Sequence, residues 1–190
     1  MESSVDFDRL VEDIRGERLD VVAQFFQAAE ATLLVLDWMP QADALEKPEL
    51  QLLLEYWQRL RGDRKLPPAD MVSPFDMRPA LGHVVIVEAL DEGREGTYRL
   101  FGTKVAQRLG ADLTGGRLGD LDKGSYLALF ARALHRAVFL EARPIFVVYQ
   151  TPAEISATAW HWLIMPLAGA ADGVVTRYLE GMMPAADRKR

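Results

Sequence analysis

The first third of the chain repeats its apolar residues at the three- and four-residue spacing of amphipathic helices. One helix is predicted around Phe7, Leu10, Val11 and Ile14, with Gly16 placed to end it. A longer stripe over Leu19–Trp38 predicts a second helix that ends before Pro40. The apolar face of this second helix consists of six residues, Val22, Phe25, Phe26, Ala29, Leu33 and Leu36.

A third helix begins at Pro48, a residue that the first helical turn accepts, and ends at Gly62. It is followed by a proline-rich connector, Arg61–Pro79, which suits neither a continuous helix nor a central strand. Beyond the connector, runs of β-branched and aromatic residues predict strands. Five are expected: His83–Glu88, Thr97–Phe101, Ile145–Gln150, Ala157–Leu167 and Val174–Met182. A short helix over Thr103–Leu109 and a longer helix after Ser125, each with a hydroxyl residue as its predicted cap, separate the second strand from the third.

This order of elements predicts an α+β fold, with one five-stranded antiparallel sheet and helices packed on a face. A strand with one solvent-exposed face alternates apolar and polar residues. Three of the predicted strands instead contain runs that are apolar at both odd and even positions: Val84–Val87, Ile145–Tyr149 and Trp160–Met165. We therefore expect the amino-terminal helices to cover the second face, within the chain or across a dimer. In this scheme residues 1–46 are a helical extension, 47–182 the domain with its leading helix, and 183–190 a solvated tail.

Composition excludes several classes of protein. The chain has no cysteine, which rules out disulfide scaffolds, thiolate zinc sites, iron–sulfur clusters and cysteine nucleophiles, and favours a cytoplasmic location. The net charge of −6 is uneven, because residues 1–70 contribute −7 and residues 71–190 contribute +1. The chain lacks the basic patch that nucleic acid requires and the apolar leader of a signal peptide. Its longest uncharged run, Ile155–Ala171, is too short to span a membrane.

Four groups of residues along Leu54–Met182 carry a resemblance to a known family. They are Tyr56-Trp57 with Leu60-Arg61 ahead of Leu66-Pro67, the string Tyr98–Thr103, the segment Leu109–Gly115, and Met165–Leu167 before the Asp172-Gly173 turn. In order and spacing they resemble the PAS sensor domain, and in particular a family of short, single-domain PAS proteins of alphaproteobacterial type. The resemblance implies a sensory module that binds a small molecule or a signalling protein, usually without catalysis of its own.

Two loops carry incomplete motifs. The segment Gly110–Arg117 has two glycines at the spacing of a phosphate loop, but glycine and arginine stand where lysine and serine or threonine belong. The segment Asp120–Gly124 resembles the start of a calcium loop, yet its glycine comes one position early and Ala131 replaces the closing glutamate. Neither loop therefore predicts a nucleotide or calcium site.

The remaining chemistry-bearing residues give no catalytic pattern. His83, His135 and His161 lack metal-ligand spacing, and no serine lies in a nucleophile-elbow context. His135 lies on the helix that supplies the axial ligand in haem-binding PAS domains, but an ordinary hydrogen-bonded imidazole is the favoured interpretation. We expect no enzyme activity, no metal and no cofactor, and the missing cysteine excludes cysteine-adduct flavin photochemistry.

Candidates for a ligand pocket are aromatic residues with a few polar ones among them. They are Phe101, Arg117, Tyr126, Phe130, Tyr149 and His161. Core filling is the commoner role of an aromatic residue, but these side chains would bound a mostly apolar cavity with polar tips, which suits a small organic ligand. We expect Trp160 and Trp162 to face the covering helices and His161 to face the cavity, although the parity of that strand permits the reverse.

We therefore expect a cytoplasmic PAS-type sensory protein that binds a small molecule or a signalling partner. Its output would pass through another protein, because no kinase, cyclase or DNA-binding segment is recognised. A homodimer is expected through the aromatic face of residues 19–38, with neither nucleic acid nor membrane as a partner. The alternative is a small enzyme, or a carrier of lipids or other small molecules, that uses the same cavity.

Overall fold

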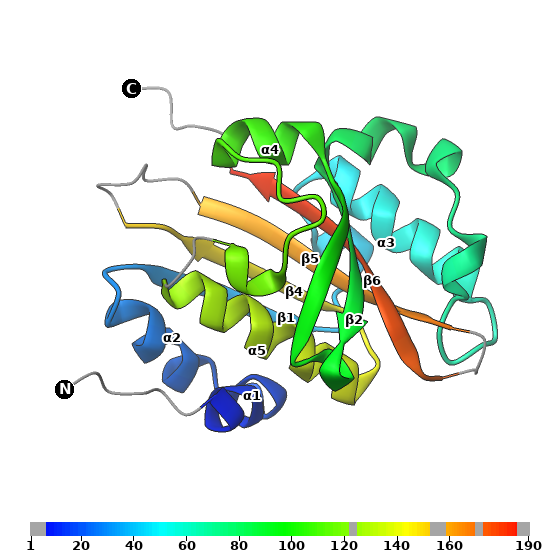
Figure 1. Ribbon diagram of the computed structural model, residues 1–190. Coiled ribbons are helices and arrows are strands. Elements are labelled where there is room, and N and C mark those ends of the chain that lie inside the picture. The colour runs from blue at the N-terminus through cyan, green and yellow to red at the C-terminus, as the bar shows by residue number, and fades with distance from the viewer. Residues whose placement is uncertain (1–6, 122–124, 153–158, 170–172, 186–190) are drawn as a thin grey trace.

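The computed structural model of the chain describes residues 7–121, 125–152, 159–169 and 173–185 (Figure 1). Its helices are α1 (Phe7–Arg15), α2 (Leu19–Gln27), α3 (Pro48–Arg61), α4 (Thr103–Leu109) and α5 (Tyr126–Glu141). Its strands are β1 (Thr32–Trp38), β2 (Val84–Leu90), β3 (Glu95–Phe101), β4 (Ile145–Gln150), β5 (Ala159–Ala168) and β6 (Val175–Pro184). Short 3-10 helices complete the fold: η1 (Ala42–Ala44), η2 (Ala69–Met71), η3 (Pro74–His83), η4 (Asp91–Gly93) and η5 (Leu118–Asp120).

The strands form one antiparallel sheet in the order β1-β4-β5-β6-β2-β3. All five predicted strands are present, and the α+β class is confirmed. Ala157, the predicted first residue of the fourth of these strands, lies outside the described residues. The sheet has a sixth strand, β1, which pairs with β4 from Thr32 opposite Gln150 to Trp38 opposite Ile145. The prediction of a five-stranded sheet therefore missed one edge strand.

The single helix predicted over residues 19–38 is wrong in its second half. Helix α2 ends at Gln27, and Glu30 takes a positive φ of 57° just before β1 begins. The segment Thr32–Trp38 is apolar and rich in residues that strands tolerate. Its residues therefore fit both the apolar spacing of a helix and the composition of a strand. Pairing with β4 decides between the two states, and that partner lies more than a hundred residues further along the chain.

Both faces of the sheet are covered, as the apolar runs predicted, but by different helices. On one face lies α5, with α1 packed against it and the indole Nε1 of Trp38 donating to Ile14 O at 3.1 Å. On the other face lies α3, where Trp57 Nε1 donates to Pro166 O at 2.8 Å. The second face is thus closed by α3, and the amino-terminal helices extend the α5 layer (Figure 1).

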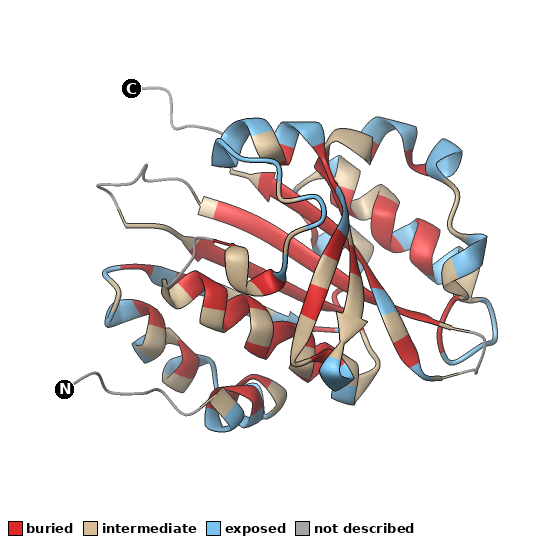
Figure 2. Cartoon of the chain, in the orientation of Figure 1, coloured by how far each residue is buried: buried red, intermediate tan, exposed pale blue. Residues whose placement is uncertain are grey.

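The register of the sheet assigns each parity of β5 to one face. Trp162 stands opposite Val147 and Met182, and its indole bonds beneath α5, whereas Leu163 stands opposite Gly181, which abuts Leu50 and Leu53 of α3. Trp160 and Trp162 therefore face α5, while His161 faces α3. Figure 2 shows β5 buried along almost its whole length, because both layers press on it.

Apart from α2, which ends earlier than predicted, the ends of the helices follow the sequence signals with one further exception. Ser125 Oγ accepts a hydrogen bond from Leu127 N at 3.1 Å, so the predicted cap of α5 is confirmed. At α4 the capping residue is Gly102 and no side chain caps the helix, so the cap assigned to Thr103 is wrong. Strand β6 continues through Pro184 and buries Met183, which had been assigned to the tail. No helix in the described ranges is long and apolar enough to cross a membrane.

Candidate functional site

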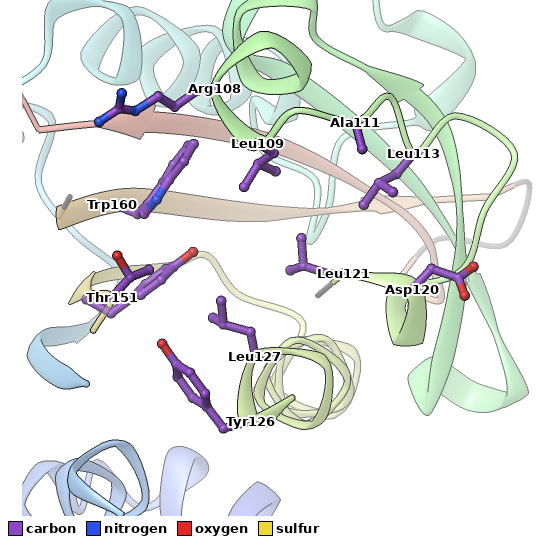
Figure 3. Close-up of a pocket in the computed structure, with 11 residues that line it drawn as sticks. Arg108, Leu109, Ala111, Leu113, Asp120, Leu121, Tyr126, Leu127, Thr151 and Trp160 are labelled. Atoms are coloured by element: carbon purple, nitrogen blue, oxygen red, sulfur yellow. The ribbon is translucent and has the colours of Figure 1, made fainter. Parts of the chain in front are cut away.

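A pocket of about 420 Å³ opens between α4, the start of α5 and the ends of β4 and β5 (Figure 3). Helix α4 supplies its last residues and the following loop supplies two apolar ones, while α5 contributes its first turn. The lining residues within the described ranges are Arg108, Leu109, Ala111, Leu113, Asp120, Leu121, Tyr126, Leu127, Tyr149, Thr151 and Trp160. Segments far apart in the sequence therefore meet at one cavity.

The lining is apolar over most of its area and polar at a few points. Leucine side chains from the α4 loop and α5 face the aromatic rings of Tyr149 and Trp160. Arg108, Asp120, Thr151 and the tyrosine hydroxyls supply both donors and acceptors. Such a lining suits a small organic molecule with an apolar body and one or two polar groups.

An aromatic cluster supports the wall of the pocket from behind. Phe26 of α2 is fully buried, and its ring centroid lies 4.7 Å from Phe130, 5.4 Å from Tyr126 and 6.0 Å from Tyr149. Two of these three partners line the pocket themselves. Helix α2 is therefore in direct contact with the side chains that form the cavity wall.

A buried polar network lies deeper under α5. His135 Nε2 lies 2.8 Å from Glu180 Oε1, and Trp162 Nε1 donates to Glu180 Oε2 at 2.7 Å, with His135 and Glu180 both fully buried. His135 Nδ1 lies 2.7 Å from Ala131 O, and this nitrogen must donate because a carbonyl oxygen only accepts. One proton is consequently shared between Nε2 of the imidazole and Oε1 of the carboxyl group.

A buried phenol group, that of Tyr178, is hydrogen-bonded to this network. Tyr178 donates its hydroxyl hydrogen to His135 O at 3.1 Å. Burial, with a smaller contribution from the charge of Glu180, raises the pKa of Tyr178 and of Tyr98 above the usual value. Both phenols therefore stay protonated.

His135 has both ring nitrogens engaged, so binding a haem iron would require breaking one of these contacts.

The structure brings together two of the six predicted pocket residues, Tyr126 and Tyr149. Phe130 lies behind the wall against Phe26, and Phe101 packs on Tyr98 with 5.2 Å between ring centroids. The side chain of Arg117 is exposed and its backbone N–H donates to Asp120 at 2.8 Å. None of these three residues is among the described residues that line the pocket, so these three predictions are corrected.

His161 is a further correction. Its ring faces α3, 5.9 Å from the ring of Phe146, and only 5% of the residue is exposed. Within the described residues Nδ1 has no hydrogen-bond partner, and burial, assisted by the charge of Lys47, lowers the pKa of the imidazole. Trp160 lines the pocket instead. When the residues on both faces of a strand are apolar, the sequence of the strand does not predict which face packs against α5.

The apolar face predicted to form a dimer, over residues 19–38, is partly buried within the chain itself. Val22, Phe26 and Leu33 are buried, and they pack between α2, β1 and the α5 layer. The other members of the stripe, Phe25, Ala29 and Leu36, keep intermediate exposure. The aromatic face therefore serves mainly as core beneath α2.

The glycine-rich loop after α4 has a structural role at the sheet edge. Gly115 N donates to Tyr98 O at 2.8 Å, and Tyr98 N donates to Gly116 O at 3.0 Å. These amides pair with β3 and do not form an anion cradle. Over the described residues no group of three or more His, Asp and Glu side chains is arranged to hold a metal ion.

Sequence reasoning missed most of the lining on the α4 side. Leu109, Ala111 and Leu113 fall within the segment that carried the family resemblance, and Trp160 is paired with Tyr149 across β4 and β5. The helix that precedes the loop and the strand pairing were both predicted. Their meeting around one cavity depends on the tertiary placement of α4.

Comparison with known proteins agrees with this architecture. The family model of the PAS domain matches residues 45–182, from the approach to α3 through most of β6. This match contains β2 to β6 and leaves α1, α2 and β1 outside it. Searches of the curated proteins and of the solved structures found no match. Because the match spans most of the chain and the sheet is that of the predicted fold, the chain belongs to the PAS domain family, which indicates a sensory or regulatory role.

Proposed function

We propose that this protein senses a small organic molecule held in the pocket between α4, α5 and the sheet, and signals through a partner protein. The observation that carries the proposal is the pocket itself. Its volume of about 420 Å³ lies in the range of small-molecule sites, and its lining is apolar with a few polar groups. The proposed activity is binding, with no catalytic step assigned to the site.

The lining indicates the character of the ligand. The rings of Tyr149 and Trp160 favour a flat apolar or aromatic body, since stacked and edge-on ring contacts add to area burial. Arg108 and Thr151 offer donors for an anionic or carbonyl group at one part of the lining. A small aryl or unsaturated acid has both features.

A route for the signal follows from the aromatic cluster. Tyr126 and Tyr149 line the pocket, and both rings contact Phe26 of α2. A ligand that shifts either tyrosine must also shift Phe26, because close-packed rings do not move independently. Helix α2 lies outside the matched PAS domain and would report the bound state to a partner.

Native mass spectrometry of the purified chain tests the binding proposal. We expect the wild-type protein to carry a small-molecule adduct or to acquire one from a panel of aryl and unsaturated acids. Ala111→Trp should abolish the adduct, because Ala111 is an exposed lining residue and an indole there fills the cavity.

Ala44→Trp is the matched control. Ala44 is also exposed, but it lies in η1, which packs against α3 on the other side of the sheet. This variant should keep the adduct. Binding that survives in Ala111→Trp, or no binding by the wild-type chain to any member of the panel, contradicts the proposal.

A further inference from the structure

The outer edge of β1 is the open edge of the sheet. β1 pairs with β4 on one side, and no backbone hydrogen bond between described residues reaches Thr32–Trp38 from the other side. Leu34 is 49% exposed, Met39 just beyond the strand is 44% exposed, and Val35 and Leu36 are half-buried. An unpaired strand edge is a ready template for pairing with another chain.

The usual protection of an edge is weak along β1. Proteins blunt such edges with lysine, proline, bulges or a covering loop. From Ala31 to Met39 there is no lysine, arginine or proline, and the charged residue is Asp37. One irregularity in register, between Leu33 and Val35, interrupts an otherwise continuous apolar strand.

The opposite edge of the same sheet is already paired at its middle. Along β3 the glycine loop pairs with the outer backbone, since Gly115 N donates to Tyr98 O and Tyr98 N donates to Gly116 O. Thr97 and Arg117 form a further antiparallel bridge there. The sheet can therefore be extended at β1 and is blocked at β3.

We propose that β1 pairs antiparallel with β1 of a second copy of the chain, so that two six-stranded sheets join across a twofold axis. The pairing of identical strands uses the same surface on both copies, and it stops at two because β3 is capped. The charge pattern fits this partner. Asp37 lies near one end of β1, so an antiparallel partner places the two carboxylates at opposite ends of the joint.

The mass of the full chain in solution is the first test. Sedimentation velocity should give twice the 21.3 kDa mass of the wild-type chain. Leu34→Lys should give the monomer mass, because a lysine on an exposed edge position opposes strand pairing without disturbing the core. Circular dichroism of the variant should match that of the wild type.

Leu100→Lys is the matched control for this test. Leu100 is 37% exposed and lies on β3, the capped edge of the same sheet. This variant should remain dimeric. A monomeric wild-type chain over the whole accessible concentration range, a dimeric Leu34→Lys, or equal dissociation by both lysine variants overturns the proposal.

Spin labels identify the arrangement independently of the mass. The chain has no cysteine, so single cysteines at the exposed positions Thr32, Leu34 and Asp37 can be labelled cleanly. An antiparallel joint near Leu34 should give a shorter distance between labels at Leu34 than at Thr32 or Asp37. Equal distances at the three positions, or no distance short enough for adjacent strands, overturns the proposal. The result for the dimer is independent of the ligand-binding test, because neither Leu34 nor Leu100 lines the pocket.

Discussion

Helices cover both faces of the sheet, but the buried polar side chains on the two faces differ in their hydrogen bonding. Under α5, the carboxyl group of Glu180 is met by both His135 and Trp162, and the pocket opens on this same side. Under α3, leucines pack closely against Gly181, and the ring nitrogen Nδ1 of His161 has no partner within the described residues. The buried polar groups under α5 are therefore hydrogen-bonded to one another, whereas the face under α3 is filled mainly by apolar side chains.

This difference shows that burial by itself does not mark a functional side chain. His135 and His161 are both almost inaccessible to solvent. They differ in hydrogen bonding, because the first belongs to a complete network and the second does not. A buried polar group without a partner costs stability, while a satisfied network fixes the packing around it. Replacing a buried polar side chain by leucine should therefore destabilise the fold on the α5 face and stabilise it at His161 on the α3 face.

The largest effect is expected from Glu180→Leu. The leucine has a similar size but leaves Nε2 of His135 and the indole N–H of Trp162 without a hydrogen-bond partner. Breaking a buried, paired network from one side costs about 3–5 kcal/mol of the free energy of unfolding. Urea denaturation followed by tryptophan fluorescence measures it.

Glu180→Gln is the control for that substitution. Its amide oxygen can accept from Trp162 while its amide nitrogen donates to Nε2 of a neutral His135 that keeps its Nδ1–H on Ala131 O. The loss should then be less than half of that in Glu180→Leu. Equal losses in the two variants would show that shape, and not hydrogen bonding, holds this site.

A cavity on the α3 face should destabilise the fold and leave the pocket intact. Leu53→Ala removes a fully buried side chain that touches the sheet near Gly181. Truncations of this kind cost about 3 kcal/mol. We expect chemical denaturation to show that loss, while native mass spectrometry still finds the pocket occupied. If occupancy fell together with stability, the two faces would not be separable.

The smallest effect, and one of opposite sign, is expected from His161→Leu. The substitution removes a buried nitrogen that has no partner and keeps the apolar contact with Phe146. Relief of that desolvation penalty is worth about 1 kcal/mol, so the variant should be more stable than the wild type at neutral pH. A clear loss of stability in the denaturation curve would mean that His161 has a polar role on the α3 face.

The same variant should be less sensitive to acid. Burial lowers the pKa of His161 below its usual value of 6.5, so the unfolded chain takes up a proton that the folded chain refuses. Stability therefore falls as the pH drops through this interval, and the leucine variant lacks that loss. The stability difference between variant and wild type should widen from neutral pH to about pH 5. His83, whose pKa is also lowered by burial, continues to contribute in both proteins.

Elements with strong local signals were predictable. Helix α4 runs over the predicted residues, Thr103 to Leu109, and α5 starts immediately after Ser125. The strand Ile145–Gln150 has the expected bounds, because a β-branched run between turn residues has few alternatives. The same local signals failed at β1, where a helical spacing and a strand composition coincide.

The candidate site shows the same division. Tyr126 and Tyr149 were expected to meet at a cavity and do, because the helix and the strand that carry them were both predicted. His161 was placed on the wrong side, since a one-residue change of parity moves a side chain to the other face of the sheet. Arg108 and Thr151 carried no signal of their own, as each lies at the end of its element.

Composition and local pattern were enough to predict the α+β class, the five strands of the PAS domain, the covered faces of the sheet and the absence of thiol chemistry. These features depend on composition and on contacts between near neighbours. The folded arrangement was needed to show that β1 joins the sheet, which helix covers which face, and that Glu180 contacts His135 and Trp162. Each of these depends on the pairing of segments far apart in the chain, and sequence periodicity records a buried face without naming the partner that buries it.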